Sequence, residues 1–227
     1  MPLADAIRPR TLDEVCGQKH LLAKGAPLRR IIESGHVPSL IFYGPPGTGK
    51  TTLADILAAI TNKQFFRLNA TTASLSDVKD ALDASGTLAG MGGTLLYIDE
   101  LQYFNKRQQQ SLLEYMEDGR VTLVGSTTEN PYFAVYGAIL SRATVFEFRP
   151  LTPEDIMPAL RRGMEYLCAE YGAKDCDDSV LSAIAGYSGG DVRKALTALE
   201  NTYYASGSAL DRETALQLTQ RSGMRFD

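Results

Sequence analysis

The sequence predicts an α/β fold in which a parallel five-stranded sheet is flanked by helices and followed by a small all-helical lid domain. Up to about residue 150, short and uniformly apolar runs alternate with longer helical patterns. Strands that are buried on both faces of a parallel sheet have this composition. After Pro153 no convincing strand pattern recurs. We therefore expect one domain at residues 1–150 and a helical domain at residues 151–227.

The first domain should hold strands at residues 39–43, 65–68, 94–98, 121–124 and 144–148. Helical patterns accompany them at residues 21–34, 50–60, 75–84, 106–117 and 134–142. Strand and helix alternation of this kind predicts βαβ units, with helices on both faces of the sheet.

Capping side chains mark the helix starts of the second domain. Thr152 precedes Pro153 and is followed by two acidic residues, which favour the positive N-terminal end of a helix dipole. Further helices should start at Asp177 or Asp178, at Asp191 and at Asp211.

The composition of the 227-residue chain excludes several classes of protein. Hydrophobic residues make up 44% and charged residues 22%, as in globular proteins that do not enter membranes. No apolar run approaches the ~20 residues of a membrane span, and residues 1–9 lack the apolar core of a signal peptide. The three cysteines have no CxxC spacing, which argues against a disulfide framework or a zinc site. A net charge of −4 neither supports nor excludes nucleic-acid binding.

A glycine-rich segment after the first strand matches the phosphate-binding pattern GxxxxGK[ST]. Glycines let the backbone form a concave nest whose N–H groups face anionic phosphates. Lys50 would reach the β- and γ-phosphates of a nucleotide, and the Thr51 hydroxyl would bind Mg²⁺. The residues expected at the nucleotide are Gly44, Pro45, Pro46, Gly47, Thr48, Gly49, Lys50, Thr51 and Thr52.

A second pattern, at residues 95–100, is an apolar strand that ends in Asp99 and Glu100. In isolation such a pair is usually a solvated turn, but about 50 residues after a P-loop it indicates the metal-binding half of the same site. Asp99 would hold Mg²⁺ through water, and Glu100 would polarise the attacking water. These residues predict an enzyme that hydrolyses ATP with Mg²⁺.

The order of motifs resembles AAA+ ATPases of the clamp-loader clade. After the P-loop and the acidic pair come GSTTENP at residues 125–131, LSR at 140–142 and GDVRKAL at 190–196. Within the clade, the chain is most similar to the replication-associated recombination protein A family, whose eukaryotic relative is the Werner helicase-interacting protein. The supporting segments are IRP at residues 7–9, GQKHLL at 17–22, FNK at 104–106, residues 127–133 and RFD at 225–227.

The resemblance implies roles that spacing alone does not give. Thr128 would be sensor 1, with Thr127 as the alternative. Arg142 would be an arginine finger that enters the ATP site of a neighbouring subunit, and Arg193 would be sensor 2 on the lid. Asn69 occupies the place of a polar partner for Glu100.

The same resemblance implies that Ile7, Arg8, Pro9 and Gln18 lie near the adenine. One departure is Gln102, where the family usually has a histidine; unlike histidine, glutamine cannot take up a proton.

At the level of function, the resemblance implies a DNA-stimulated ATPase that acts in replication-fork maintenance, recombination and repair. DNA forks, gaps or ends, single-strand binding protein and replisome components are its implied partners. A cytoplasmic, nucleoid-associated location and a homotetramer follow, and the sequence is expected to stop before a C-terminal oligomerisation domain. Two alternatives remain: a clamp-loader-like subunit that uses ATP mainly as a conformational ligand, and a small-molecule kinase. The sensor and finger residues argue against the kinase.

Overall fold

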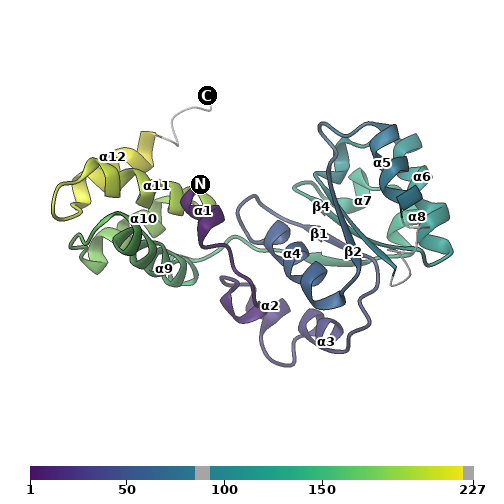
Figure 1. Ribbon diagram of the computed structural model, residues 1–227, viewed down its shortest axis with the longest axis horizontal. Helices are drawn as coiled ribbons and strands as arrows, with labels where there is room; N and C mark the ends of the chain where they lie inside the picture. Colours follow the sequence, from purple (N-terminus) through teal and green to yellow (C-terminus); the bar gives the residue numbers. More distant parts are fainter. Residues whose placement is uncertain (85–92, 222–227) are drawn as a thin grey trace.

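The computed structural model describes residues 1–84 and 93–221. An α/β lobe built around a sheet lies beside a lobe of helices, and an extended connection after the last strand runs from the first to the second (Figure 1). The segment of Arg225, Phe226 and Asp227, matched above to the family, falls outside the described residues.

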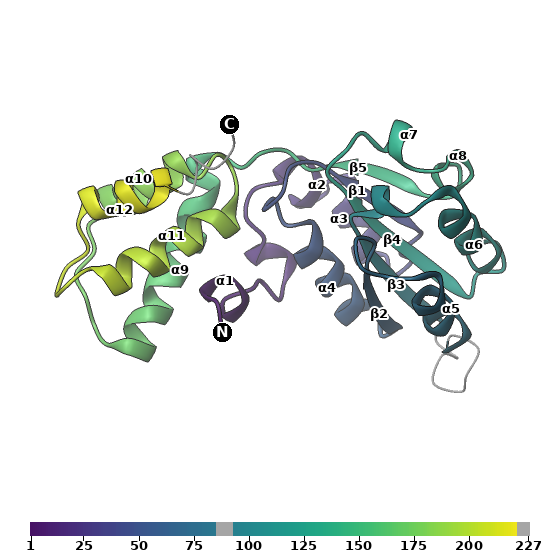
Figure 2. The same ribbon diagram turned by 90° about the horizontal axis from the view of Figure 1, so that it is seen from above.

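The sheet confirms the fold expected from the sequence. Its strands are β1 (Leu40–Tyr43), β2 (Gln64–Asn69), β3 (Thr94–Asp99), β4 (Val121–Thr127) and β5 (Thr144–Glu147). They are ordered β2-β3-β4-β1-β5, and every neighbouring pair is parallel (Figure 2). Because the strands are parallel, their carboxyl ends meet at one edge, where loops with functional side chains gather.

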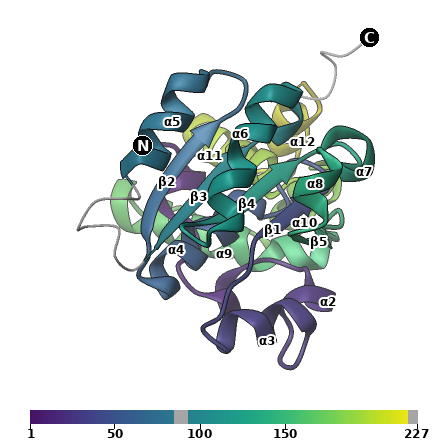
Figure 3. The same ribbon diagram turned by 90° about the vertical axis from the view of Figure 1, so that its right-hand side faces the viewer.

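Helices cover both faces of the sheet (Figure 3). One face packs against α2 (Lys19–Leu22), α3 (Pro27–Glu33) and α4 (Lys50–Thr61), through side chains such as Leu28, Phe42 and Leu53. The opposite face packs against α5 (Leu75–Ala84), α6 (Lys106–Glu117), α7 (Pro131–Ala134) and α8 (Gly137–Leu140). Short 3₁₀ turns lie at Leu12–Glu14 and Leu101–Tyr103.

Two expected helices are each divided in the structure. The pattern at residues 21–34 becomes α2 and α3, since Gly25 has a φ of 81° and Pro27 restricts Ala26 to an extended conformation. The pattern at residues 134–142 becomes α7 and α8. Asn130 caps an earlier start at Pro131, and the chain is extended at Val135. In both places local backbone chemistry interrupts a periodic apolar pattern.

The second lobe consists of α9 (Pro153–Tyr171), α10 (Asp178–Tyr187), α11 (Val192–Ala205) and α12 (Arg212–Arg221). The expected caps are present: Thr152 forms a capping box with Asp155, and Asp177 and Asp191 accept from the first backbone N–H groups of α10 and α11. Asp211 accepts in the same way from Thr214.

The helical core also contains the N-terminus of the chain. Helix α1 (Leu3–Ala6) packs beside α11, and Leu3 is 1% exposed within the core of the second lobe (Figure 1). The segment after α1 therefore crosses from one lobe to the other. Among the residues that the structure describes, no helix is both long and apolar enough to cross a lipid bilayer.

Candidate functional site

A cleft lies where the two lobes and the N-terminal segment meet. It encloses about 960 Å³ of space, including the part open to solvent. The cleft brings together most of the residues singled out from the sequence: Ile7, Arg8, Pro9, Pro46, Gly47, Thr48, Gly49, Lys50, Thr51, Thr52, Asp99, Glu100, Thr128 and Arg193.

The glycines of the loop between β1 and α4 adopt backbone angles that other residues avoid. Gly44, Gly47 and Gly49 have φ values of 143°, 68° and 101°. Gly47 also contacts the start of α11 in the helical lobe: a Cβ there would lie 1.7 Å from Asp191 Oδ1, and its carbonyl accepts a hydrogen bond from Val192 N at 3.1 Å. The glycines thus give the loop a conformation that other residues would adopt only with strain, and the start of α11 packs against it.

Lys50 is buried at the base of this nest, with 8% of its surface exposed. Its Nζ donates to the carbonyl oxygens of Gly44 at 2.6 Å and of Pro45 at 2.7 Å. Burial lowers the pKa of Lys50, and the nearby carboxylates of Glu100 and Asp99 act in the opposite direction. A buried ammonium beside the N-terminus of α4 makes this a strong site for anions.

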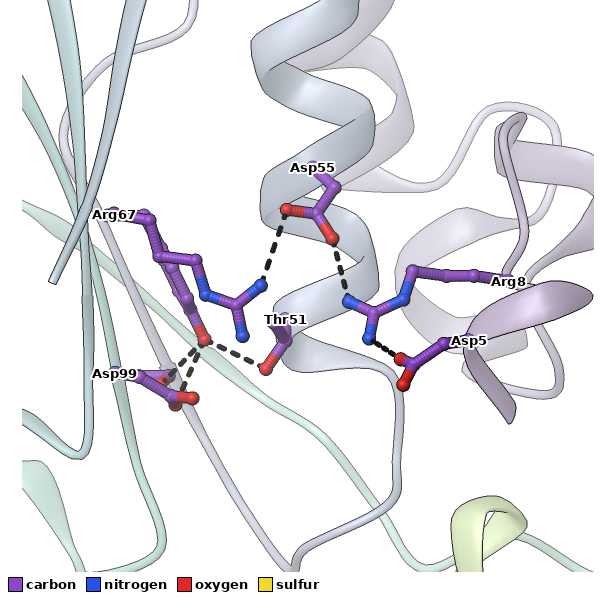
Figure 4. A network of polar contacts seen from close by, with 8 residues as sticks. Asp5, Arg8, Thr51, Asp55, Arg67 and Asp99 are labelled. Atoms are coloured by element: carbon purple, nitrogen blue, oxygen red, sulfur yellow. Dashed lines mark hydrogen bonds and ion pairs between the residues drawn. The ribbon is translucent and has the colours of Figure 1, made fainter. Parts of the chain in front are cut away.

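Thr51 and Asp99 lie close to each other (Figure 4), and the buried hydroxyl of Tyr97 contacts both. Tyr97 Oη lies 3.1 Å from Thr51 Oγ1 and donates to Asp99 Oδ1 at 3.0 Å. Ser126 Oγ also donates to Asp99 Oδ1, at 2.5 Å. One hydroxyl and one carboxylate beside a phosphate nest are a donor set that suits Mg²⁺, which binds few protein oxygens and completes its shell with water and phosphate.

A series of charged side chains links Tyr97 and its partners to the N-terminal segment. The Arg67 guanidinium lies 5.8 Å from the Tyr97 ring centroid and 4.0 Å from Asp55 on α4. Asp55 pairs in turn with Arg8 at 2.9 Å, and Arg8 also pairs with Asp5 (Figure 4). These contacts hold the segment of Ile7, Arg8 and Pro9 against the P-loop helix and so form one wall of the cleft.

Glu100 has an unusual backbone and specific partners. Its φ of 55° places it in the left-handed region, where residues other than glycine are uncommon. Its carboxylate accepts from Gln102 Nε2, and the Thr128 hydroxyl lies 3.4 Å from the same oxygen. The left-handed backbone directly after β3, together with Gln102 and Thr128, directs the Glu100 carboxylate into the cleft.

Six singled-out residues do not line the cleft. One is Thr127, the alternative for sensor 1, which is fully buried at the end of β4 and accepts a hydrogen bond from Glu129 N at 3.0 Å. Gly44 and Pro45 begin the loop, and their carbonyl oxygens accept hydrogen bonds from the Lys50 ammonium. Gln18 is buried and uses its amide on the backbone, donating to Thr48 O and Arg149 O and accepting from Arg149 N. It therefore clamps the P-loop to the end of β5.

The remaining two make other contacts. Asn69 Oδ1 accepts from the backbone N and the hydroxyl of Thr71, and within residues 1–84 and 93–221 no hydrogen bond joins it to Glu100. Arg142 follows α8 on the outer surface, where it pairs with Glu117 at 2.5 Å and donates to Ala138 O.

The structure adds residues to the cleft that the sequence analysis missed. Cys16 and Arg162 line it together with small or apolar side chains from the N-terminal segment and the lid. Burial raises the pKa of the Cys16 thiol, and Arg162 donates to Glu14 O at 3.2 Å. No local motif marks these residues, because they reach the cleft only when α9 packs against the N-terminal segment.

Comparison with known proteins agrees with this geometry. Residues 40–151 match the model of the ATPase family associated with various cellular activities (AAA). Replication-associated recombination protein A of Escherichia coli K12 is 44% identical over 202 residues, covering 88% of this chain and 45% of that protein. The protein of the same name from Haemophilus influenzae is 38% identical over 234 residues, covering 100% of this chain and 52% of that protein. The chain thus spans about half the length of these relatives.

The fold is also found in a solved structure, Thermotoga maritima RuvB, described as a Holliday junction branch migration motor. The TM-score is 0.77 at 24% identity, with 94% of this chain and 72% of that chain covered. At this identity the likeness concerns the fold alone. From the family match, the sequence identities and the P-loop geometry, we conclude that residues 40–151 form a domain of the AAA family of ATPases and that the chain resembles replication-associated recombination protein A.

Proposed function

We propose that the chain binds ATP with Mg²⁺ in the cleft between its lobes and hydrolyses it, as the ATPase module of a DNA-dependent ATPase in replication-fork maintenance, recombination and repair. One observation carries the proposal. A phosphate nest with a buried lysine, an acidic pair at a strand end and a lid arginine all line the same cleft. We further propose that residues 1–150 form the catalytic domain and residues 151–227 its lid.

Each residue has a distinct part in this proposal. The P-loop N–H groups and Lys50 bind the phosphates, and Arg193 contacts them from the lid. Thr51 and Asp99 hold Mg²⁺, which neutralises phosphate charge when bound. Glu100 orients a water for attack on the γ-phosphate, and Thr128 fixes the position of that carboxylate. Hydrolysis of ATP and departure of phosphate would remove the anion that Lys50 and Arg193 share, which frees the lid to move.

Arg142 has a separate role in the proposal. It lies on the outer surface of the α/β lobe, 41% exposed, and outside the cleft of its own chain. An arginine in this place is free to reach the ATP site of an adjacent copy after it leaves Glu117. A homo-oligomer, a tetramer in the full-length protein, would then contain shared sites. Asn69 would act on Glu100 only after it leaves Thr71.

The proposed link to DNA rests on the relatives. The proteins that the chain matches are named for replication and recombination. We infer that DNA forks, gaps or ends stimulate the ATPase, and that single-strand binding protein or replisome components are further partners. A cytoplasmic, nucleoid-associated location would follow from this work on DNA.

The test is the steady-state ATPase rate of the full-length protein with and without forked DNA, for the parent and for Glu100→Gln and Arg142→Ala. We expect DNA to raise the parent rate and both variants to lose at least a hundred-fold, as loss of a positioned base or of an arginine finger does. The lack of stimulation by forked, gapped and blunt DNA would refute the DNA link. A fully active Glu100→Gln variant would refute the assigned hydrolytic role.

A further inference from the structure

We propose that the buried hydroxyl of Tyr97 is a positioning group that sets the orientation of both magnesium ligands, Thr51 and Asp99, so that nucleotide and metal bind cooperatively. The inference rests on the proposed ATP–Mg²⁺ site. It goes beyond it because neither the P-loop pattern nor the acidic pair includes this tyrosine.

Strand geometry explains why Tyr97 reaches the site. Side chains alternate along a strand, so Tyr97 and Asp99 point to the same face of β3. That face is covered by α4, which carries Thr51 in its first turn. In β4, Gly125 is paired with Ile98, so Ser126 lies beside Asp99. A tyrosine two residues before Asp99 therefore places its hydroxyl among Thr51, Asp99 and Ser126.

Tyr97 has a single proton, which can go to Asp99 Oδ1 or to Ser126 Oγ, each at 3.0 Å, while Ser126 itself donates to Asp99 Oδ1. In both arrangements the Tyr97 oxygen keeps a lone pair that can accept a proton. The Tyr97 oxygen can then accept the proton of Thr51 at 3.1 Å. A hydroxyl that binds a cation must point its proton away from it. When Tyr97 accepts that proton, the lone pairs of the Thr51 oxygen remain available to a cation.

The same arrangement acts on the carboxylate. Both donors contact Oδ1 of Asp99, and among the described residues Oδ2 has no hydrogen-bond donor. Two hydrogen bonds to one oxygen fix the rotation of the carboxylate, and Oδ2 stays available to a water of the metal shell. Tyr97 is fully buried and Ser126 is 1% exposed, so water does not compete for these bonds.

Tyr97→Phe tests the inference, because it removes only the hydroxyl and keeps the ring that fills the core. The matched control is Tyr203→Phe, which removes another buried hydroxyl, bonded to Gly172 O in the helical lobe. The measurement is the affinity for a fluorescent ADP analogue in EDTA and in excess Mg²⁺, together with the melting temperature without ligand. The ratio of the two affinities gives the coupling between nucleotide and metal.

We expect Tyr97→Phe to reduce the ratio of the affinity in Mg²⁺ to the affinity in EDTA by about ten-fold or more. Changes in residues that hydrogen-bond to metal ligands have effects of this size. The affinity in EDTA should stay at the parent value. Ser126→Ala should reduce the ratio less, because Thr51 keeps its acceptor. Equal loss of affinity in EDTA and in Mg²⁺, or a parent-like ratio in Tyr97→Phe, would overturn the inference and leave the proposed function intact. A parent protein that binds no nucleotide in either condition would overturn both.

Discussion

Gln102 donates a hydrogen bond from its side-chain Nε2 to the carboxylate of Glu100, the residue proposed to orient the attacking water. The same nitrogen lies 3.3 Å from the Thr128 hydroxyl, so a single amide joins two proposed catalytic side chains. The family usually has histidine in this place. The structure shows that glutamine can supply a donor there without a group that titrates near neutral pH.

Gln102→Ala is expected to lower the ATPase rate about ten-fold with little change in nucleotide affinity. Hydrogen bonds to charged groups are worth about 1.5–3 kcal/mol, and this one holds Glu100 in position. Steady-state kinetics on the full-length protein give the measurement. Gln110→Ala is the control, since Gln110 is an exposed residue of α6. A Gln102→Ala rate equal to that of the parent would exclude a positioning role.

Gln102→His should retain activity but add a pH dependence. An imidazole with a pKa of about 6.5 gains a proton as the pH falls and then pairs more strongly with Glu100. This pairing holds the carboxylate away from water and raises the imidazole pKa above its ordinary value of about 6.5, so the rate of the variant should already start to fall relative to the parent above that pH. Parallel pH profiles for variant and parent would contradict this expectation.

Gly47→Ala should destabilise the contact between P-loop and lid. Alanine at position 47 would have to adopt a φ of 68°, which strains its backbone. Its Cβ would also overlap Asp191 Oδ1, so both strain and a clash oppose the native arrangement. We expect a loss of about 1–3 kcal/mol in unfolding free energy, measured with urea. Gly25→Ala is the matched control, because its φ is 81° but nothing lies within 4 Å of the added Cβ. Equal losses in both variants would show that the lid contact contributes nothing.

Nucleotide binding should take up protons at alkaline pH. Burial lowers the pKa of Lys50 below its ordinary 10.5 in the protein without nucleotide. Bound phosphates favour the ammonium and raise that pKa, so between the two values binding adds a proton and the affinity falls as the pH rises. Calorimetry in buffers of different ionisation enthalpy measures this uptake. Lys50→Arg should abolish the uptake, and its persistence there would assign it to another group.

Two inactive variants should restore activity when mixed, if Arg142 acts on a neighbouring subunit. In a mixed oligomer, a subunit with Arg142→Ala keeps Glu100 and receives an intact arginine from a neighbour that carries Glu100→Gln. ATPase rates before and after subunit exchange of the full-length variants provide the measurement. Glu117→Gln is the control: it frees Arg142 from its ion pair and should not lower the rate. If ATPase activity does not recover although the subunits are shown to exchange, Arg142 does not act in the site of a neighbouring subunit.

Much of the fold could be predicted because its signals are local. Uniformly apolar runs gave the strands of the parallel sheet, and the caps at Thr152, Asp177 and Asp191 gave the helix starts. The places where prediction failed are also local: Gly25 and Pro27 divide one expected helix. The spacing of apolar residues shows which face of such a segment is buried, but it does not reveal a break in the helix backbone.

The sequence by itself determined the phosphate nest and the acidic pair. Glycine conformation, a lysine and strand-end carboxylates are requirements of adjacent residues. Only the tertiary structure decided what surrounds them. Tyr97 belongs to an apolar run in the sequence, yet in the structure its hydroxyl meets partners 46 and 29 residues away. A hydroxyl gains its role from the groups that folding brings within 3 Å or so, and neither spacing nor composition encodes those distances.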